Sequence, residues 1–248
     1  EAKVDAIHPG YGFLSENVKL ASSSKRSNIK FIGPNEKALK VFGDKTSAKA
    51  LASDLSVPIT LGTSAKTSLK QAENFFKGLK KNSSILIKAI SGGGGRGMRI
   101  VSNLENLKEA FERASSEAKA SFDSPDLYVE EYLKDYRHIE FQILGDGTGN
   151  VIHLHERECS IQRRHQKLIE IAPSPSLNQD LKNKMIEASL AFGTKVKYEG
   201  LATIEFLVNI EKGDFRFIEC NPRIQVEHTV TESITSLDLV KLQIQIAS

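Results

Sequence analysis

The chain has 248 residues, of which 40% are hydrophobic and 26% are charged, so it can form one large domain or two smaller domains with buried cores. The formal net charge of +3 is too small to predict a nucleic-acid or membrane partner. The two cysteines, Cys159 and Cys220, form no CxxC pair, which excludes a disulfide-based scaffold.

Short apolar runs followed by turn-forming residues mark the first part of the chain. The run at 4–7 leads into His-Pro-Gly-Tyr-Gly, and the run at 31–32 leads into Gly-Pro, a pattern typical of strands that end at a turn. Residues 46–54 predict a helix that ends before Pro58, because a residue preceding proline avoids the helical conformation.

The middle of the chain places a glycine-rich loop between two strands. Residues 84–90 are rich in β-forming side chains, glycines dominate 91–97, and a strand resumes at 98–101. A helix is predicted next, capped by Ser102 or Asn103. Its apolar stripe has helical spacing and consists of Leu104, Leu107, Phe111 and Ala114.

The second half combines antiparallel hairpins with one long helix. Asn178 caps a predicted helix that runs to Ala191, with Gly193 as its C-terminal stop. Interspersed helices and hairpins predict an α+β fold rather than a purely parallel sheet. The predicted strands are 128–129, 139–144, 151–155, 201–209 and 215–220, with a tight hairpin loop at 146–150.

The glycine loop at 91–97 is a candidate phosphate site, since glycines let backbone N–H groups crowd around phosphate oxygens. It is neither a Walker A loop, which needs Gly-Lys-Ser/Thr, nor a Rossmann turn, which needs a following helix. A plain hairpin tip explains the composition equally well. Lys88 favours the phosphate interpretation, because a lysine inside an apolar strand needs an anion nearby.

Two glutamates in the last hairpin are candidate metal ligands. Pairing the strands about Lys212 places Glu205 opposite Glu219, and like charges facing each other across strands are destabilising. Because both lie in apolar runs, a metal or a shared proton is expected, and with Asn221 they offer the oxygen ligands that Mg²⁺ prefers. Two solvent-facing glutamates on an edge hairpin are the alternative.

The segment 221–228 follows that hairpin directly. Arg223 can bind a small anion through two hydrogen bonds, and Glu227 is placed to act as a general base beside it. Taken alone, this segment is better explained as a surface loop with an ion pair. The basic run 162–167 lacks interleaved aromatic residues, so it favours phosphate handling over nucleic-acid binding.

Taken together and in order, these segments resemble the biotin carboxylase family of ATP-grasp enzymes over essentially the whole chain. The resemblance is carried by 8–17, 31–34, 43–45, Lys88 with 92–98, 137–140, 156–160, 162–167 and 217–228. It implies an α+β ATP-grasp fold with a glycine-loop lid at about 60–132 and an antiparallel-sheet subdomain for metal and nucleotide. It also implies that 1–44 are the end of a Rossmann-like N-terminal domain and that 45–248 are the ATP-grasp domain.

The resemblance implies a role for each matching residue. Lys45 and Lys88 would contact ATP phosphates, and Glu130 would read the adenine edge with the backbone of Glu131 and Leu133. The other implied ATP-binding residues are Gly94, Gly95, Met98, His138, Gln162, His165 and Leu207. The implied metal ligands for Mg²⁺ or Mn²⁺ are Glu205, Glu219 and Asn221. Bicarbonate would be bound by Arg223, Gln225, Val226 and Glu227, and Tyr11 and Gly12 would lie on the biotin side.

The implied reaction has two steps. Glu227 deprotonates bicarbonate, which attacks the γ-phosphate of ATP to form carboxyphosphate, with Lys167 near the transferred group. Carboxyphosphate breaks down to CO₂ and phosphate, the phosphate takes the N1 proton of biotin, and Arg223 stabilises the biotin enolate that attacks CO₂. Glu227, Arg223 and Lys167 are thus the implied catalytic residues.

The resemblance also implies partners and limits. The expected partners are a biotin carboxyl carrier domain or subunit, a carboxyltransferase domain or subunit, and further copies of the full-length chain. Because the chain starts at Glu1 without methionine and the family continues past Ser248, we expect a fragment. Without a membrane span or signal peptide, we expect a cytoplasmic protein with neither membrane nor nucleic-acid partners.

Two segments, 169–173 and 226–232, resemble the pyruvate carboxylase branch more than acyl-CoA carboxylases. One alternative is another ATP-grasp ligase, such as a carbamoyl-phosphate synthetase half, which would share the lid and the metal hairpin. A second alternative is a non-catalytic nucleotide-sensing or nucleic-acid-binding module. Nucleic-acid affinity would collapse with added salt, whereas Mg-dependent ATP binding would not.

Overall fold

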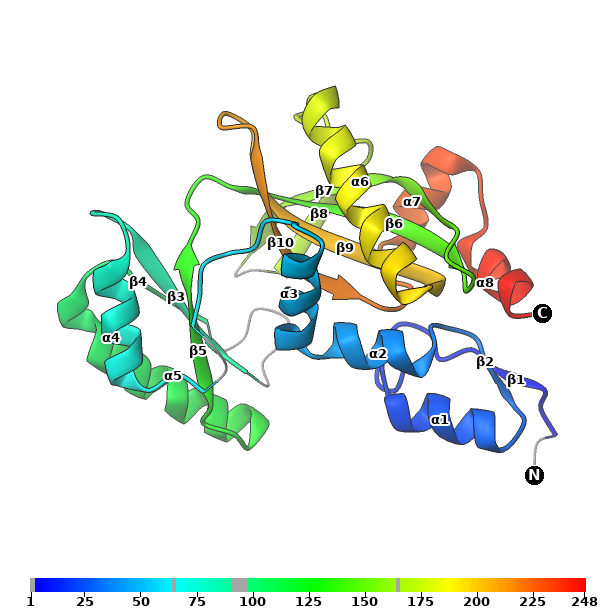
Figure 1. The fold of residues 1–248 in the computed structure, drawn as a ribbon, viewed down its shortest axis with the longest axis horizontal. Coiled ribbons are helices and arrows are strands. Elements are labelled where there is room, and N and C mark those ends of the chain that lie inside the picture. Colours follow the sequence, from blue (N-terminus) through cyan, green and yellow to red (C-terminus); the bar gives the residue numbers. More distant parts are fainter. Residues whose placement is uncertain (1–2, 64–65, 91–97, 164–165) are drawn as a thin grey trace. The chain divides into compact units, whose positions relative to one another are not determined.

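A computed structural model describes residues 3–63, 66–90, 98–163 and 166–248 (Figure 1). The chain divides into two compact units. The large unit comprises 1–59, 136–161 and 169–248, and the small unit comprises 60–135 and 162–168. Within the described ranges, no helix is both long and apolar enough to cross a membrane.

The small unit is a three-stranded antiparallel sheet with two helices. Its strands are β3 (Ser84–Ala89), β4 (Arg99–Val101) and β5 (Leu127–Tyr132), in the order β4-β3-β5. The helices α4 (Leu69–Gly78) and α5 (Leu107–Phe122) pack on it through Ala72, Leu107, Ala114 and Ala118. The predicted glycine loop lies outside the described residues, but the predicted strands on either side of it are present as β3 and β4, which pair antiparallel.

Helix α5 begins later than its sequence suggests. Asn103 caps only a short 3₁₀ turn, η1 (Leu104–Asn106), and makes no side-chain capping hydrogen bond. The α-helix itself starts at Leu107, so the prediction of a cap at Ser102 or Asn103 is wrong for this helix. The predicted stripe is confirmed in part, since Leu107 and Ala114 are buried while Leu104 is exposed before the helix starts.

The large unit starts with a parallel pair of short strands and three helices. Strands β1 (Ala6–Ile7) and β2 (Lys30–Phe31) flank α1 (Val18–Arg26), and α2 (Glu36–Gly43) and α3 (Lys45–Asp54) follow. Helix α3 confirms the predicted helix at 46–54. The Asp44 side chain caps it by accepting a hydrogen bond from the backbone N–H of Ser47 at 2.7 Å.

A five-stranded sheet with the order β10-β9-β6-β7-β8 forms the centre of the large unit, and its β10–β9, β9–β6 and β6–β7 pairs are antiparallel. Its strands are β6 (Arg137–Asp146), β7 (Val151–Arg163), β8 (Gln166–Ile171), β9 (Glu199–Asn209) and β10 (Asp214–Asn221). The residues at the β7–β8 connection, 162–168, belong to the small unit. The observed mixture of helices and antiparallel sheets confirms the predicted α+β class.

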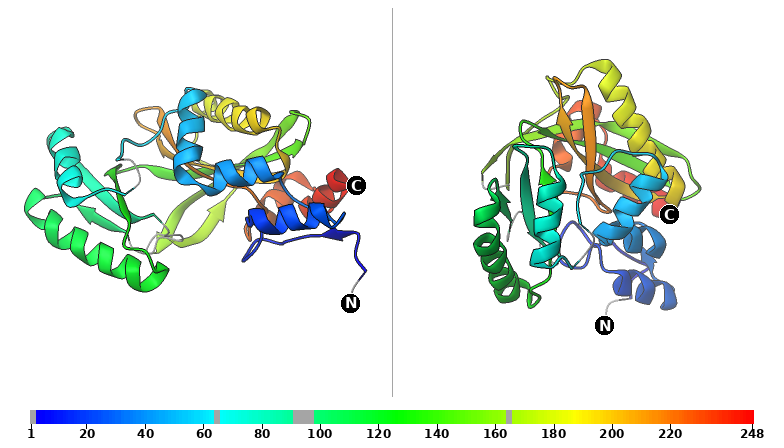
Figure 2. Two further views of the ribbon diagram at one scale, coloured as in Figure 1. Left: turned by 60° about the horizontal axis from the view of Figure 1, so that its bottom comes forward. Right: turned by 60° about the vertical axis from the view of Figure 1, so that its left-hand side comes forward.

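One face of this sheet is apolar. Helix α6 (Gln179–Val196) lies over the sheet, as Figures 1 and 2 show, and packs on this apolar face. Alternate residues of β6 and β9 point to it and pack against Met185 and Phe192 of α6; they are Ile139, Phe141, Ile143, Ala202, Ile204, Phe206 and Val208. Leu144 of β6 and Leu201 of β9 point to the other face of the sheet. There they pack with Leu239 of α8 (Leu239–Ala247). In the sequence, helix α7 (His228–Thr235) follows β10 and precedes α8.

Helix α6 confirms its predicted start but not its predicted end. The Asn178 side chain accepts from the Leu181 N–H at 2.9 Å, as a cap should. Gly193 does not stop the helix, which continues to Val196 and ends at Lys197 in the left-handed conformation. A Cβ at Gly193 would lie 2.9 Å from Val151 Cγ1. The glycine is therefore a packing requirement rather than a stop.

Gly145 provides a test of how closely β6 packs to the segment that precedes β9. A Cβ at this position would lie 2.2 Å from the carbonyl oxygen of Tyr198. We expect Gly145→Ala to lower the free energy of unfolding by about 2–3 kcal/mol, because backbone has to move. Gly43→Ala at the end of α2 meets no heavy atom within 4 Å and should change stability by less than about 1 kcal/mol. Urea-induced unfolding of the chain measures both, and equal effects would contradict the packing argument.

Candidate functional site

The face of the central sheet that points away from α6 carries the polar residues. His138, Glu140 and Gln142 of β6 alternate with the apolar residues of that strand, and Thr203 and Glu205 do the same on β9. Glu140, Gln142, Thr203 and Glu205 are buried. Buried polar groups need partners, so this face is organised by hydrogen bonds and ion pairs rather than by apolar packing.

A bulge in β10 brings Glu219 to this polar face. Phe217 pairs with Phe206, one position away from the register that a turn centred on Lys212 would give. The register then shifts between Phe217 and Glu219, which leaves Ile218 as an extra residue and places Glu219 opposite Glu205. The predicted pair is therefore confirmed, whereas the simple hairpin that it assumed is wrong. Phe217 stays in the core while Glu219 faces the other way.

Three glutamates stand in a row across neighbouring strands. Glu140 of β6 pairs with Glu205 of β9, which pairs with Glu219 of β10. Such like charges repel each other unless cations or donors separate them. Here Glu205 Oε2 lies 2.6 Å from His138 Nε2, and its Oε1 accepts from Asn221 Nδ2 at 2.6 Å. Glu219 Oε2 lies 3.9 Å from Lys45 Nζ.

The donor set fits a hard divalent cation. Glu205 and Glu219 supply carboxylate oxygens from adjacent strands on one face, and Glu205 is held within a shell of donors. His138, Glu140 and Glu205 also each place one ligand atom within 4.8 Å of the others. The Asn221 oxygen points elsewhere, because it accepts from Arg223 NH2 at 3.2 Å while its amino group faces Glu205.

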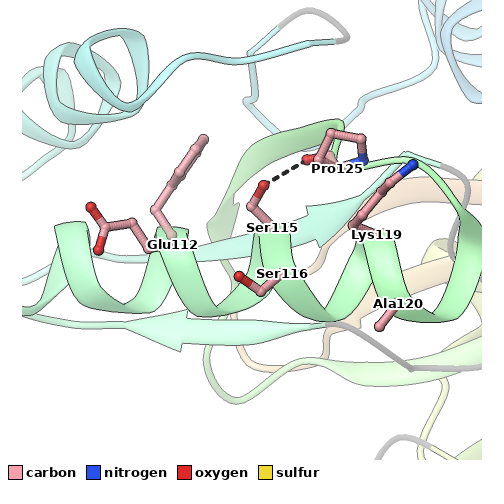
Figure 3. A pocket seen from close by; sticks show the side chains of 7 residues that line it. Glu112, Ser115, Ser116, Lys119, Ala120 and Pro125 are labelled. Atoms are coloured by element: carbon pink, nitrogen blue, oxygen red, sulfur yellow. Dashed lines mark hydrogen bonds between the residues drawn. The ribbon is translucent and has the colours of Figure 1, made fainter.

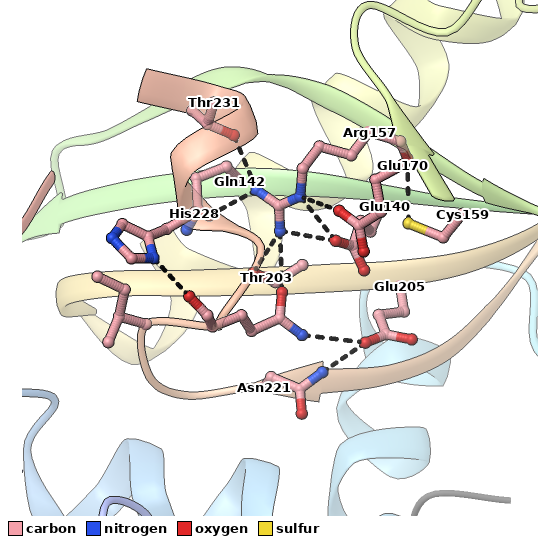
Figure 4. A network of polar contacts seen from close by, with 12 residues as sticks. Glu140, Gln142, Arg157, Cys159, Glu170, Thr203, Glu205, Asn221, His228 and Thr231 are labelled. Atoms are coloured by element: carbon pink, nitrogen blue, oxygen red, sulfur yellow. Dashed lines mark hydrogen bonds and ion pairs between the residues drawn. The ribbon is translucent and has the colours of Figure 1, made fainter. Parts of the chain in front are cut away.

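A fully buried arginine ends the row of glutamates (Figure 4). Arg157 of β7 pairs with Glu140 in the β-ladder, and its NH2 lies 2.7 Å from Glu140 Oε1. Its Nε lies 3.2 Å from Glu170 Oε2. Burial alone would lower the pKa of Arg157, but the carboxylates of Glu140 and Glu170 outweigh burial and raise the pKa above its usual value.

Sequence reasoning assigned no role to Arg157. The motif 156–160 is part of the family resemblance, but an arginine between two glutamates reads as an exposed charged strand. In the structure Glu156 and Glu158 point to the α6 side, where Lys182 lies 2.9 Å from Glu156 Oε2 and Ser174 donates to Glu158 at 2.6 Å. Successive side chains of β7 point to opposite faces of the sheet, and both faces are covered. Glu156, Arg157 and Glu158 are therefore all buried.

The predicted bicarbonate segment follows β10 directly. Arg223 Nε donates to Glu16 Oε1 at 2.7 Å, and Arg223 NH1 donates to the carbonyl oxygen of Ile224 at 3.2 Å. Gln225 is buried beneath the segment, whereas Val226 is exposed. Glu227 is half-buried at the N-terminus of α7. Arg223, Gln225 and the glutamate pair thus belong to one connected set of contacts within the large unit.

The predicted biotin-side loop reaches the same set of contacts through Glu16. Tyr11 is 53% exposed, and Gly12 lies in the same loop. The loop is held by His8, whose Nε2 lies 3.2 Å from Gln243 Oε1 of α8. Glu16 was within a matching segment but was not predicted as a site residue. Only the tertiary contact with Arg223 identifies it.

The small unit contains a second group of predicted nucleotide residues. Lys88 of β3 and Glu130 of β5 share one face of the sheet, and Lys88 Nζ lies 2.5 Å from Glu130 Oε2. Thr60 Oγ1 donates to Glu130 Oε1 at 3.3 Å, and Lys88 Nζ lies 5.7 Å from the ring centre of Tyr128. From the sequence, a lysine in an apolar strand is expected to lie beside an anion such as a phosphate. In the structure the anion beside Lys88 is the carboxylate of Glu130.

The remaining predicted residues fall in three places. Glu131 N donates to the Leu61 carbonyl oxygen at 2.9 Å in the small unit. Leu207 pairs with His138 in the large unit. Half-buried positions in the small unit are occupied by Met98, Leu133, Gln162 and Lys167. Gly94, Gly95 and His165 lie outside the described residues.

A shallow hollow on α5 is separate from these residues (Figure 3). Ser115, Lys119 and Pro125 line it, and Ser115 Oγ donates to the Pro125 carbonyl oxygen at 3.1 Å. None of the predicted site residues that the structure describes contributes to its wall. The hollow therefore adds nothing to the candidate site.

Comparison with protein families separates the two ATP-grasp interpretations. Residues 44–248 match the model of the carbamoyl-phosphate synthase L chain ATP-binding domain, and residues 1–39 match the biotin carboxylase N-terminal domain. The first match fits either interpretation, whereas the second, together with the relatives below, decides between them. The chain belongs to the biotin carboxylase family. The biotin carboxylase N-terminal match is not expected of a carbamoyl-phosphate synthetase half.

Known relatives of this biotin carboxylase chain support the same conclusion. It is 50% identical over 245 residues to pyruvate carboxylase of Bacillus subtilis and 48% identical over 248 residues to the mitochondrial pyruvate carboxylase of Homo sapiens. These alignments cover 99% and 100% of this chain but 21% of each relative. The chain therefore spans about one fifth of the curated relatives that it matches.

Solved structures confirm the ATP-grasp fold. Biotin carboxylase from Campylobacter jejuni, described as a β-γ-ATP complex, has a TM-score of 0.92 and 43% identity over 98% of this chain and 54% of that one. The biotin carboxylase domain of Hydrogenobacter thermophilus 2-oxoglutarate carboxylase has a TM-score of 0.91 and 45% identity over 98% of this chain and 53% of that one. That structure holds MgADP, ADP and bicarbonate.

Removal of the buried guanidinium tests the charge balance of the polar face. We expect Arg157→Met to lower the free energy of unfolding by about 3–5 kcal/mol, because it leaves the buried carboxylates of Glu140 and Glu170 without their cation. Lys30→Met is the matched control. It breaks a 2.7 Å pair with Glu199 whose lysine is 45% exposed and should cost less than about 1 kcal/mol. Urea-induced unfolding compares the two, and similar losses would contradict the proposed balance.

Proposed function

We propose that this chain is the ATP- and bicarbonate-binding part of an enzyme that carboxylates biotin. The observation that carries the proposal is the polar face of the large unit, where the Glu205–Glu219 pair adjoins Arg223 and Gln225. A cation-binding pair of carboxylates beside an anion-binding arginine suits a reaction between MgATP and a small anion. The resemblance of the whole chain to biotin carboxylases supports the choice of bicarbonate.

The residues of this chain would divide the work between two substrates. Lys45 and Lys88 would bind phosphate oxygens of ATP, and Glu130, Glu131 and Leu133 would bind its adenine edge. Further contacts to the nucleotide would come from Gly94, Gly95, Met98, His138, Gln162, His165 and Leu207. A Mg²⁺ ion held by Glu205 and Glu219 would supply positive charge to the phosphate oxygens. Asn221 would join these ligands once its side-chain amide rotates to present its oxygen.

Three residues would carry the chemistry on the anion side. Glu227 would remove the proton from bicarbonate, which then attacks the γ-phosphate of ATP beside Lys167. The bond from the γ-phosphorus to the bridging oxygen breaks, ADP leaves, and carboxyphosphate forms. Carboxyphosphate would release CO₂ and phosphate, and the phosphate would accept the N1 proton of biotin. Arg223 would then stabilise the enolate of biotin, which attacks CO₂. Tyr11 and Gly12 would line the biotin side, joined to Arg223 through Glu16.

The domain organisation and partners are part of the same proposal. We assign 1–44 to the end of the N-terminal domain and 45–248 to the ATP-grasp domain, with the lid at about 60–132. The partners would be a biotin carrier and a carboxyltransferase, on the same chain or as subunits, with further copies of the full-length chain. We place the enzyme in the cytoplasm, and the mitochondrial relatives suggest the alternative location.

The first test is phosphate release from MgATP by the full-length protein, with and without bicarbonate and free biotin. We expect release to require bicarbonate and to rise when biotin is added, because biotin consumes the CO₂ that carboxyphosphate yields. If the rate of phosphate release changes with neither bicarbonate nor biotin, the protein does not carboxylate biotin. That result would then favour another ATP-grasp ligase that uses a different acid substrate at Arg223.

The metal assignment has its own test. We expect Glu219→Gln, which keeps the side-chain shape and removes the charge, to lower kcat about 100-fold at a fixed Mg²⁺ concentration, with partial recovery as Mg²⁺ is raised. Glu211→Gln, at the exposed turn of the same hairpin, is the control and should leave kcat unchanged. Steady-state assays over a Mg²⁺ series measure both, and equal rates in the two variants would refute the assignment.

A further inference from the structure

Besides its ion pair with Glu170, the Arg157 guanidinium donates hydrogen bonds to side chains of β6, β9, α7 and the loop that precedes α7. NH1 donates to Gln142 Oε1 at 2.9 Å and to Thr231 Oγ1 at 2.8 Å. Nε donates to Glu140 Oε1 at 2.8 Å, and NH2 donates to Gln225 Oε1 at 2.9 Å. A weaker contact joins NH2 to Thr203 Oγ1 at 3.4 Å. Arg157 is fully buried, so it reaches no solvent and leaves no space for a substrate beside it.

These contacts determine how two glutamine amides are oriented. A guanidinium group has only donors, so the amide atom that faces it has to be the oxygen. Gln142 and Gln225 both turn their oxygens to Arg157. The amino group of Gln142 then donates to the Ala202 carbonyl oxygen at 2.9 Å. The amino group of Gln225 points to the candidate site, where it lies 3.4 Å from Glu205 Oε1.

The same arginine holds the segment that carries the anion-binding residues. Gln225 lies directly before Val226 and Glu227, and Thr231 lies on the first turns of α7, just after them. The Gln225 carbonyl oxygen also accepts from the backbone N–H of His228 at 3.2 Å. Residues 225–231 are therefore attached to β7 at both ends through a single side chain (Figure 4).

We propose that Arg157 is a positioning residue for the anion half of the site: it orients the Gln225 amide so that its amino group is presented to the bound anion. Arg157 itself touches neither ATP nor bicarbonate. This inference rests on the proposed function, since it takes the anion at Gln225 to be bicarbonate. It explains why an arginine rather than a lysine occupies the position, since a lysine has only three donors and no planar fork to reach all these acceptors.

The test compares two Michaelis constants in the full-length enzyme. In Arg157→Lys we expect the KM for bicarbonate to rise about tenfold, the effect of losing one well-placed hydrogen bond, while the KM for MgATP changes less than about twofold. Arg216→Lys makes the same chemical change on β10, where Arg216 pairs with Asp214, and should leave both constants unchanged. A purely structural role would alter both constants equally or neither, and either result would overturn the proposal.

A double mutant asks whether Arg157 acts through Gln225. If it does, adding Arg157→Lys to Gln225→Ala should change the KM for bicarbonate by less than about twofold beyond Gln225→Ala alone. A full additional tenfold rise would show that Arg157 acts by another route and would overturn the proposal.

A second variant keeps the test decisive if Arg157→Lys does not fold. Gln225→Glu leaves an acceptor for Arg157 but puts an oxygen where the amino group stood. We expect its KM for bicarbonate to rise at least about tenfold, while its KM for MgATP stays within about twofold of the value for the unmodified enzyme. An unchanged KM for bicarbonate would overturn the proposal. If the unmodified enzyme releases phosphate without bicarbonate, the proposed function fails instead, so the two failures are distinguishable.

Discussion

Opposition of like charges is the constraint on which the polar face of this protein depends. Glu140, Glu205 and Glu219 face one another across three strands, an arrangement that costs free energy in any sheet. Positive charge at both ends makes it tolerable, with buried Arg157 beside Glu140 and Lys45 near Glu219. The centre of the row, Glu205, is held by donors from His138 and Asn221. A cation at Glu205 and Glu219 would complete this balance.

The two faces of the central sheet separate stability from chemistry. Phenylalanines and aliphatic residues under α6 form the main apolar core, and the charged residues of the site stand on the reverse of the same strands. The strand period of two enforces this division, so a residue changes face only where the ladder is interrupted. The bulge before Glu219 is such an interruption, and it lets β10 contribute Phe217 to the core and Glu219 to the site.

The small unit follows the same logic on a smaller scale. Lys88 stands in an apolar strand, and its charge is met by Glu130 from the neighbouring strand. Both residues are predicted nucleotide contacts, so binding of a phosphate and an adenine would replace this ion pair with contacts to the ligand. The pair thus keeps two buried charges compensated while it occupies the residues that would bind ATP.

The sequence by itself determined the α+β class, the family, the helix α3, the capped start of α6, and the opposition of Glu205 and Glu219, because local patterns and motif order encode these features. It predicted neither the bulge that produces this opposition nor the packing role of Gly193, since both depend on neighbours distant in the chain. The roles of Arg157 and Glu16 were also not predicted, because their partners lie on other strands, loops and helices. Only the tertiary structure decided these points: buried charges and packed glycines are defined by what surrounds them in space, and a one-dimensional pattern does not contain that information.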